Sequence, residues 1–306
     1  MPIVIPKALP AFSILKHENI FVMPRARAMM QDIRPIEIAI VNLMPTKIET
    51  ETQLMRLLGN TSLQVNVTLV TMESYVGKHT PLEHMERFYK TFDSIKNTHF
   101  DGMIITGAPV ENMDYDDVKY WPELETIMAF ADEYVTSTIY ICWGAQAALH
   151  YYYGIDKIRL DKKLFGVYPY RAEDEYELLL KGMDDTFYIP MSRHTRVNEE
   201  QVRRNKSLKV LASSEEQGIS ILKSKDNRKF FFFGHSEYDR DTLKLEYLRD
   251  KTKGLDIDEP VGYFRNGNVD DVIMSWKSTA NLLFYNWLNY YVYQVTPYDF
   301  DADVAK

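Results

Sequence analysis

The chain has 306 residues, 45% of them hydrophobic and 26% charged, which is typical of an ordinary soluble globular protein. Its 44 acidic residues outnumber 36 Lys and Arg residues, and the net charge of −8 argues against nucleic acid or an anionic membrane as a partner. A single cysteine excludes an intrachain disulfide framework and fits a reducing cytosol, so we expect a cytoplasmic protein. No signal peptide is predicted, and no apolar run reaches the roughly 18 residues that a membrane-spanning helix needs.

The first half of the chain predicts strands and helices in alternation. Apolar and β-branched runs predict strands at residues 36–43, 63–69, 101–105 and 138–141. Helix-forming runs between them predict helices at residues 46–58, 82–92, 121–135 and 145–150. This alternation indicates an α/β fold with a doubly wound, mostly parallel sheet flanked by helices. Sites in such sheets form beyond the carboxyl ends of the strands.

Shorter strands follow in the second half of the chain, and helices close it. We expect strands at residues 165–170, 187–191, 208–212, 219–222 and 229–233, and helices at 240–249 and 279–293. No repeat or Gly/Ser linker divides this region. We therefore predict an N-terminal extension (1–34) that packs on the body or on a partner subunit, one domain (35–300) and a short tail (301–306).

The most informative motif is the turn around Cys142. The strand-like sequence TIYI precedes this residue, and the helix-forming sequence AQAALH follows Gly144. A strand that turns sharply into a helix presents the central side chain, and the helix N-terminus favours a thiolate there. A cysteine chosen at random is more often a small buried hydrophobe. The turn favours a catalytic nucleophile instead.

A cysteine nucleophile needs a base, and the base needs a group that orients it. His235 follows the sequence FFFF and a glycine, so it lies at the polar end of a predicted buried strand. Glu237 lies two residues further on, and in an extended segment it points to the same face as His235. We therefore predict a triad of Cys142, His235 and Glu237.

Other site chemistries find little support in the motifs. His194, His235 and Glu237 are conceivable metal ligands, but the chain has no His-x-x-x-His or Cys-x-x-Cys spacing, and we predict no metal. Neither a P-loop nor a G-x-G-x-x-G turn is present. We therefore expect no bound cofactor.

The sequence DGMIITGAP, the cysteine turn and His-x-Glu together resemble class I glutamine amidotransferase-like domains. The resemblance implies that fold, with a glycine-rich strand end contributing to an oxyanion hole. Three positions depart from the pattern of that superfamily. Tyr140 replaces a glycine before the nucleophile, Ala108 interrupts a double glycine, and Ser236 replaces a proline. These departures weaken the case for hydrolysis of glutamine.

A closer resemblance covers residues 1–300. The blocks that carry it are PIVIPKALPAF, NLMPTKIETETQLMRLLGN, TGAPVE, YICWGAQAALHYYYGI, KLFGVYPY, MSRHT and GHSEYDRDTL. They are similar to the homoserine O-acyltransferases of methionine biosynthesis. The resemblance implies transfer of an acyl group from acyl-CoA to the γ-hydroxyl of L-homoserine. With acetyl-CoA as co-substrate, the product is O-acetyl-L-homoserine.

The resemblance also assigns roles to individual residues. Cys142 carries the acyl thioester, His235 is the general base, and Glu237 is its partner. The positions that match family substrate-binding residues are Lys163, Ser192 and Arg249, and Lys47 matches an active-site lysine. From the predicted helix start, we expect the Trp143 N–H to be an oxyanion donor, with a second donor in the turn of residues 43–47.

Glu111 ends the TGAPVE block and is the predicted determinant of the acyl donor. In the resembling family, a glutamate here goes with acetyl-CoA and a glycine with succinyl-CoA. Two unit charges about 4 Å apart repel by roughly 4 kcal/mol at an effective dielectric near 20. A glutamate would therefore disfavour the free carboxylate of a succinyl group.

Alternative functions stay open at this point. A homoserine O-succinyltransferase differs only in the donor, and a glutaminase or peptidase of the same superfamily would use the same triad. A sensor or scaffold that kept the fold is the non-enzymatic alternative, which an intact triad disfavours. The expected partners are L-homoserine, acetyl-CoA and a second copy of the chain in a homodimer.

Overall fold

The computed structural model describes residues 3–30, 34–74 and 80–296, so the predicted tail (301–306) lies outside the described residues. One part of the main sheet consists of parallel strands. These are β1 (Ile3–Val4), β2 (Val22–Met23), β3 (Ile36–Val41), β4 (Val65–Val70), β5 (Tyr89–Lys90), β6 (Phe100–Ile105), β7 (Val135–Ile141) and β12 (Lys229–Phe232). The other part is antiparallel, with β8 (Lys157–Ala172), β9 (Phe187–Val197), β10 (Leu208–Ser214) and β11 (Gly218–Ser224).

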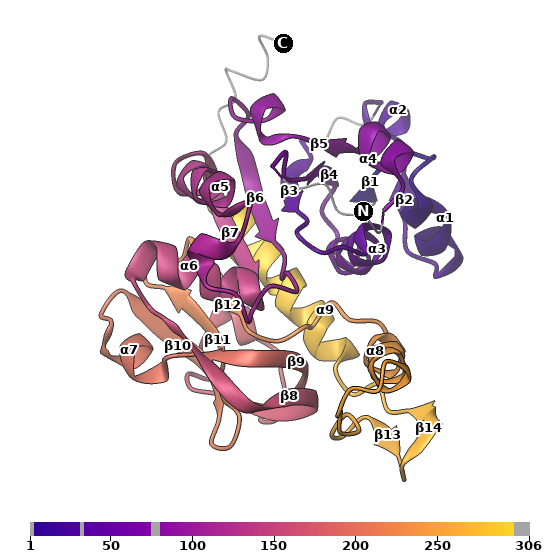
Figure 1. Cartoon of the computed structure of the whole chain (residues 1–306). Coiled ribbons are helices and arrows are strands. Elements are labelled where there is room, and N and C mark those ends of the chain that lie inside the picture. The colour runs from indigo at the N-terminus through magenta and orange to yellow at the C-terminus, as the bar shows by residue number, and fades with distance from the viewer. Residues whose placement is uncertain (1–2, 31–33, 75–79, 297–306) are drawn as a thin grey trace.

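Together these strands form one 12-stranded sheet (Figure 1). Their order is β2-β1-β4-β3-β6-β7-β12-β11-β10-β8-β9, and β5 pairs with β4. A separate hairpin joins β13 (Phe264–Arg265) to β14 (Asn268–Val272). The predicted doubly wound, mostly parallel α/β sheet is confirmed.

The helices connect the strands. They are α1 (Pro10–His17), α2 (Arg25–Ala28), α3 (Lys47–Leu58), α4 (Leu82–Phe88), α5 (Trp121–Tyr134), α6 (Trp143–Tyr153), α7 (Glu199–Arg204), α8 (Thr242–Thr252) and α9 (Lys277–Asn286). Short 3₁₀ helices occur at η1 (Phe92–Ser94), η2 (Tyr115–Asp117) and η3 (Leu178–Leu180), and a π-helix η4 (Trp287–Tyr293) continues α9. No helix within the described ranges is long and apolar enough to cross a bilayer.

Alternation along the strands separates two apolar cores. Ile38 and Ile40 of β3 belong to one core, whereas Ala39 and Val41 belong to the other, because successive side chains point to opposite faces. Helices α5 and α6 cover the second face, and α3, α9 and η4 cover the first. Trp287 of η4 donates from Nε1 to the Ser137 hydroxyl of β7 at 2.9 Å, which anchors the C-terminal helix under the strand that leads to Cys142.

The sequence prediction for residues 82–92 was wrong in part. The helix expected at residues 82–92 ends at Phe88, and the chain then forms β5 and η1. β5 pairs with β4, so tertiary pairing overrides the local pattern there.

The N-terminal residues are part of the sheet. β1 pairs in parallel with both β2 and β4, and α1 packs against α3. Arg56 of α3 donates to Glu18, which follows α1, and also to Asp239, which lies just beyond the predicted triad. The N-terminal segment thereby braces the loop that contains Glu237. The proposed boundary at residue 34 stays a prediction.

Candidate active site

Cys142 occupies a sharp turn between β7 and α6. Its backbone has φ 51° and ψ −115°, a conformation that a residue with a side chain rarely adopts. The Cys142 N–H donates to the Phe232 carbonyl at 2.7 Å, which ties the turn to β12. Gly144 is needed in the next turn of the chain, because a Cβ there would lie 2.6 Å from the Thr106 carbonyl oxygen. The predicted nucleophile therefore has the geometry of a nucleophile elbow.

Gly107 follows β6, and its backbone lies close to Cys142. A Cβ on Gly107 would lie 3.2 Å from the Cys142 Cβ and 3.6 Å from the His235 Cε1. These two distances also show that Cys142 and His235 lie side by side. Because Gly107 has no side chain, space remains next to the Cys142 side chain that any other residue at position 107 would fill.

His235 and Glu237 form the predicted pair. The His235 Nδ1 lies 2.7 Å from the Glu237 Oε1, and both side chains are buried. The backbone N–H of His235 donates to the Pro190 carbonyl at 2.8 Å. β9 approaches so closely that a Cβ on Gly234 would lie 2.4 Å from Ile189, so a glycine is required before the histidine.

The electrostatics of this pair favour a charged imidazole. Burial lowers the pKa of His235, but the negative charges of Cys142 and Glu237, with their hydrogen bonds, outweigh burial and hold the pKa well above its usual value. The Tyr238 ring stacks on the imidazole, with centroids 4.2 Å apart and planes 10° apart. His235 is therefore fixed in orientation by a carboxylate on one edge and by an aromatic ring on one face.

Trp143 is the first residue of α6, where backbone N–H groups have no acceptor within the helix. Its buried indole packs near Tyr115 and Tyr120, with ring centroids 6.2 and 6.1 Å away. In the turn predicted to hold a second oxyanion donor, the Leu43 N–H donates to the Thr106 hydroxyl at 2.8 Å and the Met44 N–H to Asn42 at 3.1 Å. Those two donors are therefore already engaged within the protein.

Lys47 is the first residue of α3, which follows β3, two strands away from β7 and Cys142. Its Nζ donates to the Asn42 carbonyl and lies 5.4 Å from the centre of the Tyr89 ring. Burial lowers the pKa of Lys47 to about 8, with Glu51 opposing that effect. Glu51 in turn accepts from Tyr89 at 2.9 Å and lies 3.1 Å from the His84 Nε2. Lys47 thus belongs to a buried polar network at the same edge of the sheet as Cys142 and His235.

The predicted substrate-binding residues converge on a carboxylate that the sequence analysis missed. Glu246 of α8 accepts from the Lys163 Nζ at 2.8 Å and from the Ser192 hydroxyl at 3.0 Å. The Arg249 Nη2 lies 3.5 Å from the same Glu246 Oε1. Glu246 lies three residues before Arg249 in the helix predicted at residues 240–249. Residues three apart lie on one face of a helix, and this spacing could have indicated Glu246.

Asp250 completes this cluster. It binds the Nε and Nη2 of Arg249 at 2.6 and 2.9 Å and lies 3.8 Å from the Lys163 Nζ. The Nε–Nη2 edge of Arg249 is therefore occupied within the protein. The cluster contains two cations and two carboxylates, which is the charge pattern that complements an amino-acid zwitterion. Burial raises the pKa of Tyr238, and the charge of Glu246 adds to that effect.

Glu111 is held in place by β9. Its Oε2 accepts from the His194 N–H at 2.8 Å and from the Thr195 hydroxyl at 3.3 Å. The buried Arg193 lies within electrostatic reach of both Glu111 and Cys142: burial lowers the pKa of its guanidinium, and the two negative charges oppose that effect. The Glu111 side chain is therefore held by β9 and is not a freely solvated loop carboxylate.

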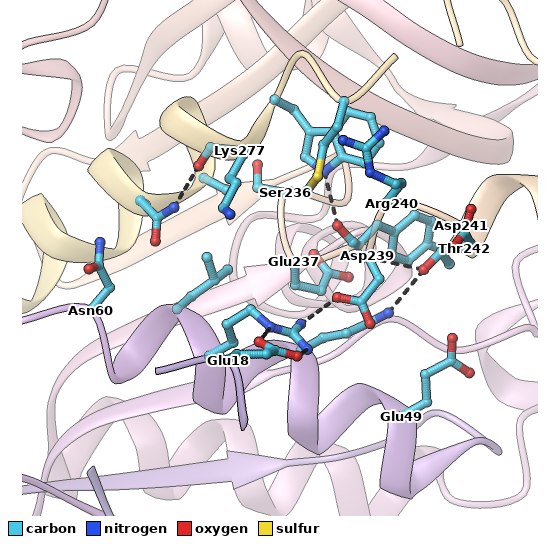
Figure 2. Close-up of a pocket in the computed structure, with 18 of the residues that line it drawn as sticks. Glu18, Glu49, Asn60, Ser236, Glu237, Asp239, Arg240, Asp241, Thr242 and Lys277 are labelled. Carbon is cyan, nitrogen blue, oxygen red and sulfur yellow. Dashed lines mark hydrogen bonds and ion pairs between the residues drawn. The ribbon is translucent and has the colours of Figure 1, made fainter. Parts of the chain in front are cut away.

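Glu237 also borders a cavity of about 590 Å³ between the N-terminal segment and α9 (Figure 2). Figure 2 shows Glu18, Glu237 and Asp239 among the side chains that line it. Residues 3–30, 34–74 and 80–296 contain no group of three His, Cys, Asp or Glu side chains that could hold a metal ion. His194, the third conceivable metal ligand, instead contributes its backbone N–H to Glu111.

A family model described as homoserine O-succinyltransferase matches residues 2–298. The chain belongs to this family. It is 56% identical to a homoserine O-acetyltransferase of Clostridium novyi, over 98% of this chain and 99% of the relative. It is 53% identical to one of Acetivibrio thermocellus, over 98% of each chain, and 52% identical to one of Bacillus licheniformis, over 98% of this chain and 99% of the relative. Family membership confirms the resemblance inferred from the sequence blocks.

Solved structures support the fold independently. A glutamine amidotransferase from Thermotoga maritima has a TM-score of 0.56 at 10% identity, covering 85% of this chain and 99% of its own. A glutamine amidotransferase from Methylobacillus flagellatus has a TM-score of 0.50 at 12% identity, covering 84% of this chain and 95% of its own. This chain thus has the glutamine amidotransferase-like fold that the sequence predicted.

We expect Lys47→Met to raise the free energy of unfolding at pH 7. The pKa of about 8 in the folded protein lies below the ordinary lysine value of 10.5, so the charged form costs about 3 kcal/mol in the folded protein. The unfolded chain binds more protons between these values, so the wild type regains stability as the pH rises through that window. Urea unfolding at pH 7 and pH 10 measures this effect. Lys16→Met, at an exposed site, is the control. If Lys47→Met gained as much free energy of unfolding at pH 10 as at pH 7, the cost would not come from the charge of Lys47.

Proposed function

We propose that this chain transfers the acetyl group of acetyl-CoA to the γ-hydroxyl of L-homoserine through a thioester on Cys142. The arrangement that carries the proposal is a cysteine at positive φ beside a buried His235–Glu237 pair 2.7 Å apart. Relatives 52–56% identical over nearly the whole chain bear the name homoserine O-acetyltransferase. We expect the enzyme to act in the cytoplasm as a homodimer, with no bound cofactor.

In the first half-reaction the Cys142 thiolate attacks the carbonyl carbon of acetyl-CoA. The tetrahedral adduct collapses, the carbon–sulfur bond to CoA breaks, and the acetyl group stays on Cys142. His235 is charged beforehand, so its imidazolium gives its proton to the departing CoA thiolate. Exchange of one thioester for another has little thermodynamic cost, which suits a reversible first step.

In the second half-reaction the γ-hydroxyl of homoserine attacks the acetyl thioester. His235, now neutral, takes the hydroxyl proton as the new carbon–oxygen bond forms, and the Cys142 thiolate leaves. The imidazolium is thereby restored, so no external acid or base is consumed. Glu237 keeps the ring oriented in both steps and stabilises its charge.

Two backbone groups are proposed to bind the oxyanion in each step. The Trp143 N–H at the start of α6 is the first, as the sequence analysis expects. Because the Leu43 and Met44 N–H groups already have acceptors, the strand end at Gly107 is the better candidate for the second. It is the backbone that lies against both Cys142 and His235.

The cluster at α8 is proposed to bind the amino-acid part of homoserine. The cations Lys163 and Arg249 face the substrate carboxylate, and Glu246 receives the α-ammonium group. The substrate carboxylate must approach the remaining Nη1 side of Arg249 or displace Asp250. In the unliganded protein these groups satisfy one another, which avoids uncompensated charge.

The choice of acyl donor rests on Glu111. The matching family model is described as a succinyltransferase, whereas the relatives cited are named acetyltransferases. The carboxylate of Glu111 is fixed by the backbone of β9, so it cannot easily swing away from the carboxylate of a succinyl group. This argument favours acetyl-CoA over succinyl-CoA in this chain.

Rapidly quenched enzyme mixed with acetyl-CoA alone should gain one acetyl group at Cys142, because the first half-reaction needs no homoserine. Intact mass followed by peptide mapping measures the adduct. Cys142→Ala should show none and should have no turnover. Glu237→Gln should still form the adduct but slowly, since general acid–base catalysis is worth about 10²–10⁴-fold. Normal turnover of Cys142→Ala would show that the nucleophile is another residue.

Glu246→Gln should raise the KM for homoserine at least tenfold and leave the rate of Cys142 acetylation by acetyl-CoA unchanged. The amide loses the charge that receives the ammonium group, worth about 1.4 kcal/mol or more. The variant should also discriminate less against 4-hydroxybutyrate, which lacks the amine. Asp250→Asn is the matched control and should keep that discrimination. Unaltered discrimination in Glu246→Gln would assign the ammonium group elsewhere.

Glu111→Gly should gain activity with succinyl-CoA relative to acetyl-CoA, by up to about a thousandfold if the two charges meet at roughly 4 Å. Values of kcat/KM for both donors measure the change. Glu111→Gln separates charge from volume, because it removes the negative charge and keeps the side-chain size. A wild type that prefers succinyl-CoA would refute the donor assignment and leave the triad assignment intact.

A further inference from the structure

A cavity of about 250 Å³ lies beyond the carboxyl ends of β3, β4 and β6. Its walls come from three loops, and most of the lining side chains are apolar. Those walls include Leu43, Pro45, Met72, Pro109, Val110 and Val118. The catalytic scheme above uses none of these side chains.

Strand register places this cavity next to the nucleophile. Ile105 pairs with Val41 on one side and with Tyr140 on the other. Two residues further along each strand, Leu43, Gly107 and Cys142 therefore follow one another across the sheet edge, about 4.8 Å from strand to strand. Leu43 lines the cavity, and Gly107 has no side chain to separate it from Cys142.

A second wall connects the cavity to the nucleophile's helix. The Tyr120 side chain lines the cavity and packs edge-on against Trp143, with ring centroids 6.1 Å apart. Pro109 and Val110 line the cavity and immediately precede Glu111, the proposed donor determinant. The cavity therefore borders the acyl site on the β6 side of Cys142.

The proposed acceptor site lies on the other side of Cys142. β12 follows β7 in the strand order away from β6, and it leads to His235, Tyr238 and the α8 cluster. A donor thioester must bring its carbonyl carbon to Cys142 while its long chain extends away from that cluster. The cavity lies on the β6 side of Cys142.

The chemistry of the cavity lining decides which part of acyl-CoA fits the cavity. The arm between the thiol and the phosphates of CoA is neutral and carries amides and a dimethyl group, which suits a mostly apolar cavity. The phosphates do not suit it, because the exposed Asp114, Asp116 and Asp117 follow Met113, and only Lys119 and the buried Lys47 supply positive charge to the lining. We propose that this cavity binds the pantetheine arm of acyl-CoA and that the nucleotide remains outside; the inference rests on the proposed function.

The test fills the cavity mouth and compares two acetyl donors. Met113 lines the cavity, and its side chain is 39% exposed, so Met113→Trp adds bulk with little risk to folding. Acetyl-CoA has the arm, whereas S-acetyl-N-acetylcysteamine lacks most of it. Met113→Trp should lower kcat/KM at least tenfold with acetyl-CoA and change it less than twofold with the truncated thioester. Met29→Trp, at an exposed methionine in the N-terminal segment, should alter neither value.

Two results would overturn the proposal. Equal losses with both donors would show that the substitution damages the acyl site, and unchanged activity with both would place the arm elsewhere. If circular dichroism shows that Met113→Trp is unfolded, Lys119→Trp at the same mouth replaces it under the same criteria. Failure of the wild type to acetylate Cys142 with either donor would instead reject the proposed function itself.

Discussion

The turn at Cys142 is the constraint on which the rest of the site depends. A residue with a side chain is held at φ 51°, and this strain persists because the surroundings fix the turn from both sides. The Phe232 carbonyl accepts the Cys142 N–H, and α6 approaches the Thr106 carbonyl so closely that only glycine fits at residue 144. The same packing that strains the backbone therefore places the thiol beside His235 and the N-terminus of α6 next to the thiol.

Much of the fold could be predicted from the sequence, because buried parallel strands have a strong local signature. The runs that became β3, β6 and β7 are apolar and β-branched, and each is followed by a helix that covers it. The two-residue strands β1, β2 and β5 could not be predicted. Their existence depends on pairing with β4 and with each other, and so few residues carry no periodicity. The sequence likewise carries no sign that residues 10–17 pack on α3.

Cys142, His235 and Glu237 could be predicted from local motifs, whereas the contacts of the residues around them could not. Cys142, His235 and Glu237 lie at strand ends, where one short motif fixes both the chemistry and the place of a side chain. Glu246 was missed because its role depends on β8 and β9, which bring Lys163 and Ser192 to α8 from distant parts of the sequence. Glu111 shows the same limit. Its assignment came from the family block, but its rigidity comes from the backbone of β9, which no local pattern reveals.

Charge balance explains how such a site tolerates burial. Cys142 and Glu237 hold the pKa of His235 well above its usual value against the effect of burial, and the α8 cluster pairs its cations with its own carboxylates. Lys47 is the exception, since burial lowers its pKa to about 8 and Glu51 opposes that effect only in part. A residue that costs stability where an apolar side chain would fit is expected to be retained for function. The edge of the sheet thus holds three separate features: a mostly apolar cavity beyond β3 and β6, the Cys142 and His235 side chains at the ends of β7 and β12, and a cluster of paired charges at α8.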